Sequence, residues 1–327
     1  YRPLGELVSF ASGGTPSKKR DDYWDGTIPW ISAKTLKTEN IDTSDLFITE
    51  EGLKAGSKIA PKGSILLLTR GSGLFNGIPI ARVEKDVAFN QDIKCLDSYG
   101  EVENEFIFYW LLSQKDYLMA KVGVTGIGAG KFDLDFLQKL MIPIPSERER
   151  KSIVGFASSI SEKIRCNAKV NDNLQQQAQA LFKSWFLNYE PWDGTAPNSW
   201  LHGKLGDYAN IKRGGSPRPI QEYLSDSGLR WLKISDVTGL QTPFIIDIKD
   251  HIIEEGLKKT VFLKAGSLVL SNSATPGIPK ILDVDSCIHD GWLYFPESRF
   301  SNEYLYLYFK YIRQQLVNLS NGSVFNN

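Results

Sequence analysis

The chain has 327 residues, and its 38 Lys and Arg residues balance its 38 Asp and Glu residues to a formal net charge of zero. This length predicts two domains of roughly 150 residues each rather than one. The hydrophobic fraction of 42% and the charged fraction of 23% exclude a largely disordered chain. A neutral total also argues against a nucleic-acid-binding protein, unless the charge is unevenly distributed along the chain.

No apolar run approaches the roughly 18 residues that a membrane-spanning helix needs. The opening segment, YRPLGELVSF, has no signal-peptide pattern, and the absence of an initial Met indicates a trimmed or unresolved N-terminus. Cys95, Cys166 and Cys287 are spaced neither as a disulfide framework nor as a pair of metal ligands. Together these features predict a protein of the reducing cytoplasm.

The segment over 4–37 is the first half of an internal repeat, because it returns in modified form over 205–238. Within it, GGTP at 13–16 matches GGSP at 214–217. Further matches follow in the same order: Trp30 and Trp231, 50–54 and 254–258, 63–66 and 266–269, 77–79 and 277–279, and 105–108 and 303–306. Chance would not keep so many matches in order, so the sequence predicts two copies of one domain.

Each copy is predicted to contain both strands and helices. The apolar runs GSILLLT at 63–69 and GSLVLSN at 266–272 follow a turn and have the length of buried strands. Long periodic segments over 102–122 and 302–319 predict a helix in each copy. The first copy continues over 131–145 (KFDLDFLQKLMIPIP) and the second does not, so the end of the second copy is expected to be missing.

Residues 146–187, between the two copies, are predicted to form one long helix. Ser146 and Glu149 fit a capping box at its start, and no proline follows until Pro191. A stripe of about four heptads predicts a coiled-coil strand, although an amphipathic helix packed on one domain is the alternative. Two heptad-spaced sets form this stripe, which we call the seam: Ala157, Ile164, Asn171, Ala178 and Trp185, and Ile153, Ile160, Asn167, Leu174 and Leu181.

Two asparagines interrupt the apolar seam. Asn167 and Asn171 would fix the register or the choice of partner if they are buried between helices. They would have no such role if the middle of the helix is exposed.

The sequence carries no recognisable catalytic apparatus. The histidines, His202, His251 and His289, fall in the second copy or just before it, so a histidine mechanism would belong to only one copy. The glycine-rich run TGIGAGKF at 125–132 lacks the first Gly and the final Ser or Thr of a phosphate-binding P-loop. No acidic cluster has the spacing of metal ligands. The chain is therefore predicted to be a binding protein with no catalytic residue, metal or cofactor of its own.

Polar and aromatic residues follow both glycine pairs and recur after the apolar strands. Lys and Arg neutralise phosphates, and Arg, Asn and Gln read base edges, so these loops are candidate DNA contacts. In the first copy the candidates are Lys18, Lys19, Arg20, Tyr23, Trp30, Lys34, Arg70, Ser72, Asn76, Asn90 and Gln91. In the second copy they are Arg213, Ser216, Arg218, Lys233, Asn272, Ser273, Thr275 and His289. Each loop alone would also fit an ordinary solvated turn.

The order of these motifs resembles the specificity (S) subunit of type I restriction–modification systems. The resemblance covers nearly the whole chain, and the linker is its most specific part. It implies an α+β fold with two homologous mixed α/β target recognition domains, over 1–145 and 191–327, joined by a long coiled-coil-type spacer helix over 146–190. The matching stretches are LGELVSFASGGTPS (4–17), IPWISAKTLK (28–37), PKGSILLLTRGS (61–72), FNQDIKCL (89–96), IPIPSERERKSIV (142–154) and KIRCNAKVNDNLQQQAQALFKSWF (163–186).

The resemblance also implies a function. The chain would be a non-catalytic subunit that binds a bipartite site in double-stranded DNA and directs adenine methylation and cleavage by its partners. Methyltransferase (M) and restriction (R) subunits would dock on it, and S-adenosylmethionine, ATP and Mg would bind only to those partners. The second conserved helix of the family has no counterpart here. We therefore expect the spacer helix to form a homodimer with a second copy, or to pair with a helix that the full-length protein supplies.

Two other interpretations fit the same sequence: a duplicated protein-interaction scaffold, or the recognition fragment of a fused restriction–methylation enzyme. The distribution of charge permits DNA binding, because residues 146–187 carry 7 basic and 4 acidic groups, and residues 204–235 carry 6 basic and 3 acidic groups. The neutral total still predicts weak DNA binding by the isolated chain, with much of the phosphate affinity coming from partner subunits.

Overall fold

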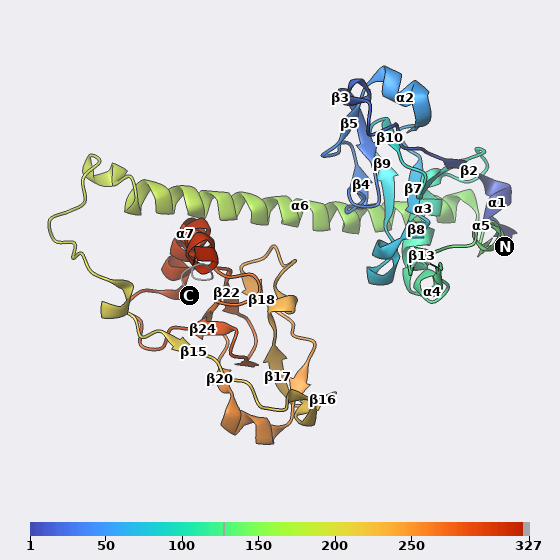
Figure 1. The fold of residues 1–327 in the computed structure, drawn as a ribbon. Coiled ribbons are helices and arrows are strands. Elements are labelled where there is room, and N and C mark those ends of the chain that lie inside the picture. Colours follow the sequence, from blue (N-terminus) through green and yellow to red (C-terminus); the bar gives the residue numbers. More distant parts are fainter. Residues whose placement is uncertain (127, 323–327) are drawn as a thin grey trace. The chain divides into compact units, whose positions relative to one another are not determined.

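The structure is a computed structural model that describes residues 1–126 and 128–322. The chain divides into two compact units, Tyr1–Ala168 (unit 1) and Lys169–Asn327 (unit 2), and the division falls within the long helix α6 (Glu147–Phe186; Figure 1). Each unit combines β-sheets with helices, so the predicted α+β class is confirmed. The predicted domain boundaries remain a prediction, because this division does not separate α6 from its neighbours.

Unit 1 is built on two main sheets. One has the strand order β2-β11-β7-β9-β4, formed by Val8–Ser12, Ile93–Ser98, Ile65–Leu68, Ile80–Val83 and Asn40–Ile41. The other has the order β5-β3-β10-β6, formed by Phe47–Ile48, Trp24–Ile31, Val87–Phe89 and Lys58–Ala60. The predicted strand over 63–69 is β7, whose four residues are fully buried in the core of this unit.

Smaller elements complete unit 1. The short strands are β1 (Arg2–Pro3), β8 (Arg70–Gly71), β12 (Gly123–Val124), β13 (Gly130–Lys131) and β14 (Met141–Ile142). The helices are α1 (Leu4–Leu7), α2 (Glu50–Gly56), α3 (Asn104–Ser113), α4 (Lys115–Met119) and α5 (Leu134–Gln138), with 3-10 turns η1 (Asp21–Tyr23) and η2 (Ser72–Asn76). The single helix predicted over 102–122 is wrong, since Gln114, with φ −97° and ψ 5°, interrupts it between α3 and α4.

Unit 2 repeats this plan with two five-stranded sheets. One has the order β15-β24-β21-β22-β18, formed by Lys212–Arg213, Trp292–Tyr294, Leu268–Ser271, Pro279–Leu282 and Phe244–Ile245. The other has the order β16-β19-β17-β23-β20, formed by Leu224–Ser225, His251–Ile252, Leu229–Leu232, Ser286–Ile288 and Val261–Leu263. Helix α7 (Asn302–Gly322) confirms the helix predicted over 302–319. The 3-10 turns are η3 (Glu190–Trp192), η4 (Leu205–Asp207), η5 (Ile220–Glu222), η6 (Ile234–Asp236) and η7 (Glu254–Lys259).

The strand registers show that the two copies share one framework. In unit 1, β3 and β10 are parallel, with Trp30 opposite Ala88. In unit 2, β17 and β23 are parallel, with Trp231 opposite Cys287. The two tryptophans are the pair matched in the sequence repeat, so the predicted duplication is confirmed at the level of strand pairing.

One part of unit 1 has no counterpart among the described residues of unit 2. Leu137, Leu140 and Ile142, from α5 and β14, are buried in the core of unit 1, and β14 pairs with β1. The described residues of unit 2 enclose a cavity of about 660 Å³. Aromatic side chains line much of it: Phe186, Trp200, Tyr208, Phe300, Tyr304 and Tyr308.

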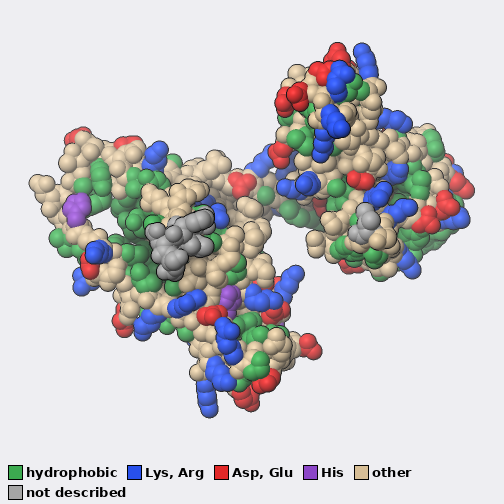
Figure 2. All heavy atoms as spheres, viewed as in Figure 1, with side chains coloured by type: hydrophobic (Ala, Val, Ile, Leu, Met, Phe, Trp, Pro, Cys, Tyr) green, Lys and Arg blue, Asp and Glu red, His purple; other side chains and the backbone are tan. Residues whose placement is uncertain are grey.

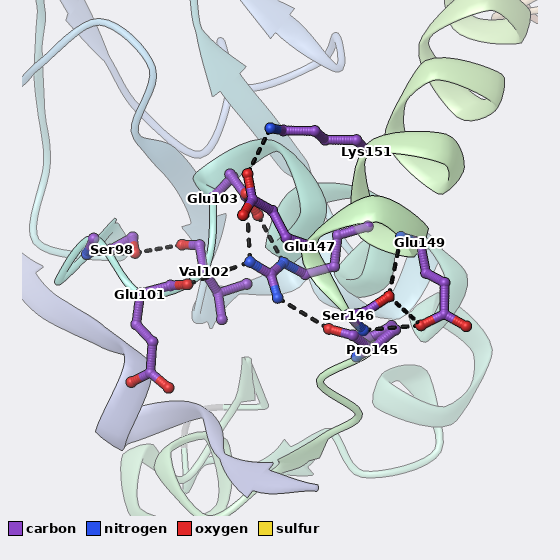
Figure 3. Close-up of polar contacts among 11 residues, drawn as sticks. Ser98, Glu101, Val102, Glu103, Pro145, Ser146, Glu147, Glu149 and Lys151 are labelled. Atoms are coloured by element: carbon purple, nitrogen blue, oxygen red, sulfur yellow. Dashed lines mark hydrogen bonds and ion pairs between the residues drawn. The ribbon is translucent and has the colours of Figure 1, made fainter.

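Helix α6 begins as the sequence predicts. The Ser146 backbone N–H donates to Glu149 Oε2 at 2.9 Å, and the Glu149 backbone N–H donates to Ser146 Oγ at 3.4 Å, so the capping box is confirmed (Figure 3). Toward its other end, the buried Phe182 packs against Tyr304 of α7, with ring centroids 5.3 Å apart. Over the described ranges, no helix combines the length and the apolar character that crossing a membrane requires.

Candidate nucleic-acid interface

In each unit, one hydrogen bond joins two of the loops predicted to contact DNA. We call 13–16 and 214–217 the glycine loops, and 90–92 and 289–291 the strand-end loops, since the latter follow β10 and β23. The Thr15 hydroxyl donates to Gln91 Oε1 at 2.7 Å, and the Ser216 hydroxyl donates to Asp290 Oδ1 at 2.7 Å. Gln91 in unit 1 and Ser216 in unit 2 are both predicted contact residues. The same hydrogen bond therefore places one predicted residue where the two loops meet in each unit.

The glycines of the glycine loops pack against protein backbone. A Cβ atom on Gly13 would lie 2.0 Å from the carbonyl oxygen of Phe89, and one on Gly214 would lie 2.3 Å from that of His289. The Gly14 N–H also donates to Phe89 O at 2.9 Å. Close packing between two loops therefore accounts for these glycines without a bound phosphate.

Four predicted basic residues of unit 1 are available for phosphates. They are exposed, and within the ranges 1–126 and 128–322 none of them has a carboxylate partner: Lys18, Lys19, Lys34 and Arg70. Arg20 differs, because its Nε and Nη2 donate to the two carboxylate oxygens of Asp22 at 2.8 and 2.6 Å, and its guanidinium lies 4.9 Å from the ring centroid of Tyr23. This hydrogen-bonded pair lowers the pKa of Asp22, so the charge of Arg20 is already partly neutralised.

Two predicted contact residues of unit 1 lie inside the protein. The side chain of Trp30 is only 4% exposed, packs with Ile48 and Ala88, and donates from Nε1 to Gly14 O at 3.1 Å. Asn90 is 6% exposed, and its Nδ2 donates to Asp92 Oδ2 at 3.2 Å. Both side chains hold the loops in place, and neither can reach a base in this arrangement.

The remaining predicted residues of unit 1 are exposed on its surface. Ser72 and Asn76 lie at the two ends of η2. The backbone N–H of Arg70 donates to Asp92 O at 3.2 Å, which places Arg70 beside the strand-end loop that carries Gln91.

In unit 2, basic side chains gather around Asp290. Arg218 Nη2 donates to Asp290 Oδ2 at 3.2 Å, and Arg213 Nε donates to the backbone carbonyl of Asp290. The hydrogen bond from Ser216 and the charge of Arg218 lower the pKa of the Asp290 carboxyl, which is therefore ionised at neutral pH. Asp290 is not among the predicted contact residues, although its alignment with Gln91 was a signal that could have singled it out.

The hydrogen bonds of His289 define its proton-bearing nitrogen. The Gly291 N–H donates to His289 Nδ1 at 2.8 Å, so the neutral ring carries its proton on Nε2. The ring lies between Trp231 and Trp292, with centroid distances of 6.1 and 6.4 Å. Burial lowers the pKa of His289, although Asp290 nearby opposes this effect. At neutral pH the Nε2–H group is a hydrogen-bond donor.

The other predicted residues of unit 2 lie near this group or are paired. The backbone N–H of Asn272 donates to Gly291 O at 2.9 Å, which joins the loop over 272–275, with Ser273 and Thr275, to the strand-end loop. Lys233 forms an ion pair with Asp250 and is less available for a phosphate. Figure 2 shows basic and acidic side chains interspersed over the visible face, without a large area of one sign, in keeping with the neutral total.

The seam of α6 is uncovered along most of its length. Asn167 and Asn171 are exposed in the part of the chain that the structure describes. The large apolar residues of the seam expose 45–65% of their surface, which argues against the alternative of a stripe packed on one domain: Ile153, Ile160, Ile164, Leu174, Leu181 and Trp185. The helix is held instead by other side chains, such as Arg150 and Phe182.

Comparison with known proteins places this arrangement in context. A family model described as "Type I restriction modification DNA specificity domain" matches residues 1–176. The type I restriction enzyme MjaIX specificity subunit of Methanocaldococcus jannaschii is 28% identical over 274 residues, which cover 79% of this chain and 61% of that subunit. The EcoR124I/EcoR124II specificity subunit of Escherichia coli is 31% identical over 156 residues, which cover 47% of this chain and 39% of that subunit.

The fold is also similar to a solved structure. The crystal structure of a type I restriction–modification S subunit from M. genitalium superposes with a TM-score of 0.56 at 17% identity, covering 98% of this chain and 79% of that chain. The chain thus shares the fold of that subunit, while it spans about three fifths or less of the length of the two curated relatives above.

Proposed function

The chain belongs to the family of type I restriction–modification DNA specificity domains, and on this premise we propose that it recognises double-stranded DNA, with each unit binding one half of a bipartite site. The family predicted from the sequence motifs is confirmed by the family match and by the specificity subunits of similar sequence. We further propose that this DNA recognition directs the reactions of partner subunits.

The main support for the proposal is that the two units have the same framework but different side chains where the glycine loop meets the strand-end loop. The hydrogen bond between the glycine loop and the strand-end loop is 2.7 Å in both units, yet its acceptor is the amide of Gln91 in one and the carboxylate of Asp290 in the other. A shared framework with different polar side chains supports two readers of different base sequences, since base identity is read by the donors and acceptors that a protein presents.

The proposal places catalysis on partner subunits. Methylation of adenine would use S-adenosylmethionine on M subunits, and cleavage would use ATP and Mg on an R subunit, while this chain selects the site. The uncovered seam supports a docking role for α6, because exposed large apolar side chains in a row mark interaction surfaces. Its occupant would be an M subunit or the α6 helix of a second copy.

A binding selection tests the proposal directly. The full chain is incubated at low salt with a library of random duplex DNA, and the bound molecules are sequenced. We expect two short conserved blocks separated by a spacer of constant length. A motif with one block, or no enrichment at all, would contradict two-site recognition.

Salt dependence separates DNA binding from the protein-scaffold alternative. Phosphate contacts release counterions, so the logarithm of DNA affinity should fall linearly with the logarithm of salt concentration. Arg70→Ala offers an internal check, because this exposed side chain belongs to unit 1 and should alter only one block of the motif. The fused-enzyme alternative requires catalytic motifs in the same gene outside these residues, which sequencing of the gene would reveal.

A further inference from the structure

Asp290 of unit 2 is the centre of a polar cluster that unit 1 does not share. Its carboxylate accepts from the Ser216 hydroxyl at 2.7 Å and from Arg218 Nη2 at 3.2 Å, and its backbone carbonyl accepts from Arg213 Nε. The two arginines flank the glycine loop 214–217 directly, one on each side. One residue therefore holds two guanidinium groups at the edge where the loops meet.

The repeat shows that three differences occur together. The unit 1 residues that align with Arg213, Arg218 and Asp290 are Ser12, Ser17 and Gln91. Unit 1 thus has small neutral side chains where unit 2 has arginines, and a neutral amide where unit 2 has the carboxylate. The carboxylate of Asp290 occurs in the copy that also has the two arginines bound to it. The hydrogen bond from Thr15 or Ser216 to the residue at this position is present in both copies.

A carboxylate at this point favours base reading over phosphate binding by the arginines. An ionised carboxylate beside a phosphate is repulsive, so a cluster that only grips the DNA backbone gains nothing from Asp290. A base edge carries no net charge, and a guanidinium held by a carboxylate keeps further N–H donors free for it. Arginine donates in a bidentate manner to O6 and N7 of guanine in the major groove.

The neighbouring side chain presents the same chemistry. His289 directly precedes Asp290 in the strand-end loop, and because it accepts the Gly291 N–H at Nδ1, its donor is the Nε2–H group. Donors on all three side chains fit a base edge that presents acceptors, and guanine presents two of them in the major groove.

We propose that Asp290 is a positioning residue that holds Arg213 and Arg218 to read guanine in the half-site bound by unit 2. This inference rests on the proposed DNA-recognition function and specifies it for one half of the site. The arginines make the base contact, and Asp290 acts through them. Unit 1, which has Ser12, Ser17 and Gln91 at these positions, reads its half-site by other contacts.

The test uses the full chain in the binding selection described above, with Asp290→Asn, Arg213→Lys and Arg218→Lys. Asparagine keeps an acceptor for Ser216 but removes the charge that holds Arg218, and lysine keeps the charge but loses the planar fork. We expect the guanine preference at one or two positions of the second block to fall about tenfold, which corresponds to about 1.4 kcal/mol, while the first block is unchanged. Asp290→Glu should restore part of the preference.

Arg20→Lys is the matched control, because Arg20 is also bound to a carboxylate, that of Asp22, but in unit 1. It should leave the second block unchanged. Circular dichroism and thermal unfolding of each variant separate loss of specificity from loss of folding.

Different outcomes of the binding selection would overturn different proposals. A wild-type motif with two blocks but no guanine in the second would overturn this inference and leave the proposed function intact. Retention of the guanine preference in all three variants would also overturn it. If Arg218→Gln instead lowered the salt dependence by about one unit without changing base preference, the arginine would be a phosphate contact and the inference would be wrong. The absence of any motif would overturn both proposals.

Discussion

Arg150, in the first turn of α6, donates from Nε to Glu103 Oε2 at 2.8 Å and so ties the start of the long helix to unit 1. The other guanidinium nitrogens donate to Pro145 O at 2.9 Å and to Glu101 O at 3.5 Å. In Figure 3, dashed lines join both Glu103 and Pro145 to one guanidinium group. The side chain of Arg150 is 11% exposed, whereas that of Glu103 is 45% exposed, so the arginine is largely removed from water while its carboxylate partner is partly solvated.

Replacing this arginine should destabilise unit 1. Arg150→Ala leaves the Glu103 carboxylate and two backbone carbonyls without their donor, and we expect a loss of about 2 kcal/mol in the free energy of unfolding, measured by urea denaturation. Lys151→Ala is the control, because Lys151 pairs with Glu147 at the exposed helix surface and should contribute nothing measurable. Equal stability of the two variants would show that Arg150 does not anchor the helix.

The contribution of the Arg150–Glu103 ion pair to the free energy of unfolding should decrease as the pH falls. The hydrogen bond from Arg150 lowers the pKa of Glu103 below its ordinary value of 4.5. A carboxyl with a depressed folded-state pKa stabilises the fold above its unfolded-state pKa, and the effect is lost as the pH falls through the lower value. The stability difference between the wild type and Arg150→Ala should therefore shrink in acid. A difference that stays constant down to the acid limit of folding would contradict this.

The uncovered seam of α6 should make the chain self-associate. Ile160 and Ile164 are 46% and 65% exposed, and burying such side chains against a second helix is favourable. We expect a concentration-dependent dimer in analytical ultracentrifugation, and we expect each of Ile160→Glu and Ile164→Glu to weaken it at least about tenfold.

A control for this prediction lies on the opposite side of the helix. Lys169 follows Ile160 by nine positions, or two and a half turns, so Lys169→Glu adds an acid away from the seam. It should leave the dimer intact. A wild-type chain that remains monomeric at high concentration would show that the seam is not a homodimer surface and would leave a partner subunit as its occupant.

Lys280 of β22 should make the stability of unit 2 rise at alkaline pH. Its side chain is 5% exposed, and its ammonium group donates to the carbonyls of Leu240, at 2.6 Å, and Thr242. Burial, with a further contribution from Lys310, lowers the pKa of Lys280 to about 8 from 10.5. Between these values the unfolded state binds a proton that the folded state has released, so stability increases with pH, by up to about 3 kcal/mol.

Urea unfolding at pH values between about 8 and 10.5 checks this sign. Lys280→Met should remove the rise, while Lys264→Met, which removes a largely exposed lysine paired with Asp285, should keep it. Comparing variants matters because burial raises the pKa of Cys287 to about 11, which opposes the rise in the same range. Identical pH profiles for the wild type and Lys280→Met would contradict the prediction.

The exposed lysines of unit 1 should carry part of the salt dependence of DNA binding. Lys18 and Lys19 have no carboxylate partner in the part of the chain that the structure describes, so each is free to neutralise a phosphate. Each of Lys18→Gln and Lys19→Gln should lower the slope of log affinity against log salt by about one unit, without changing the sequence motif. Arg20→Gln should have a smaller effect, because Asp22 already neutralises part of that charge. Equal slopes for all three variants would contradict this assignment.

Features set by neighbours in sequence could be predicted before the structure. The capping box at Ser146 depends on a residue three positions away, and the end of α6 at Phe186 lies within one residue of the predicted limit of 187. The duplication was visible because the framework residues, such as Trp30 and Trp231, keep their order in both copies.

Features that depend on contacts between distant parts of the sequence could not be predicted before the structure. Asn90 has the side chain of a base reader, but its burial is set by strands that meet only in the folded unit. The role of Asp290 depends on arginines more than seventy positions away. Residue type indicates what a side chain can do, whereas its accessibility follows from tertiary packing.

Trp30 shows this most directly and gives the last prediction. Its indole is nearly fully buried and donates to Gly14 O at 3.1 Å, and it meets Trp24 edge to face with centroids 5.3 Å apart. Trp30→Phe keeps most of the apolar volume but loses the hydrogen bond, so we expect a loss of about 1–2 kcal/mol in the free energy of unfolding. Since the side chain does not reach the surface, the motif selected from random DNA should be unchanged under conditions where the variant is folded. If Trp30→Phe were as stable as the wild type and changed the first block of the motif, the indole would contact DNA after a rearrangement of the glycine loop.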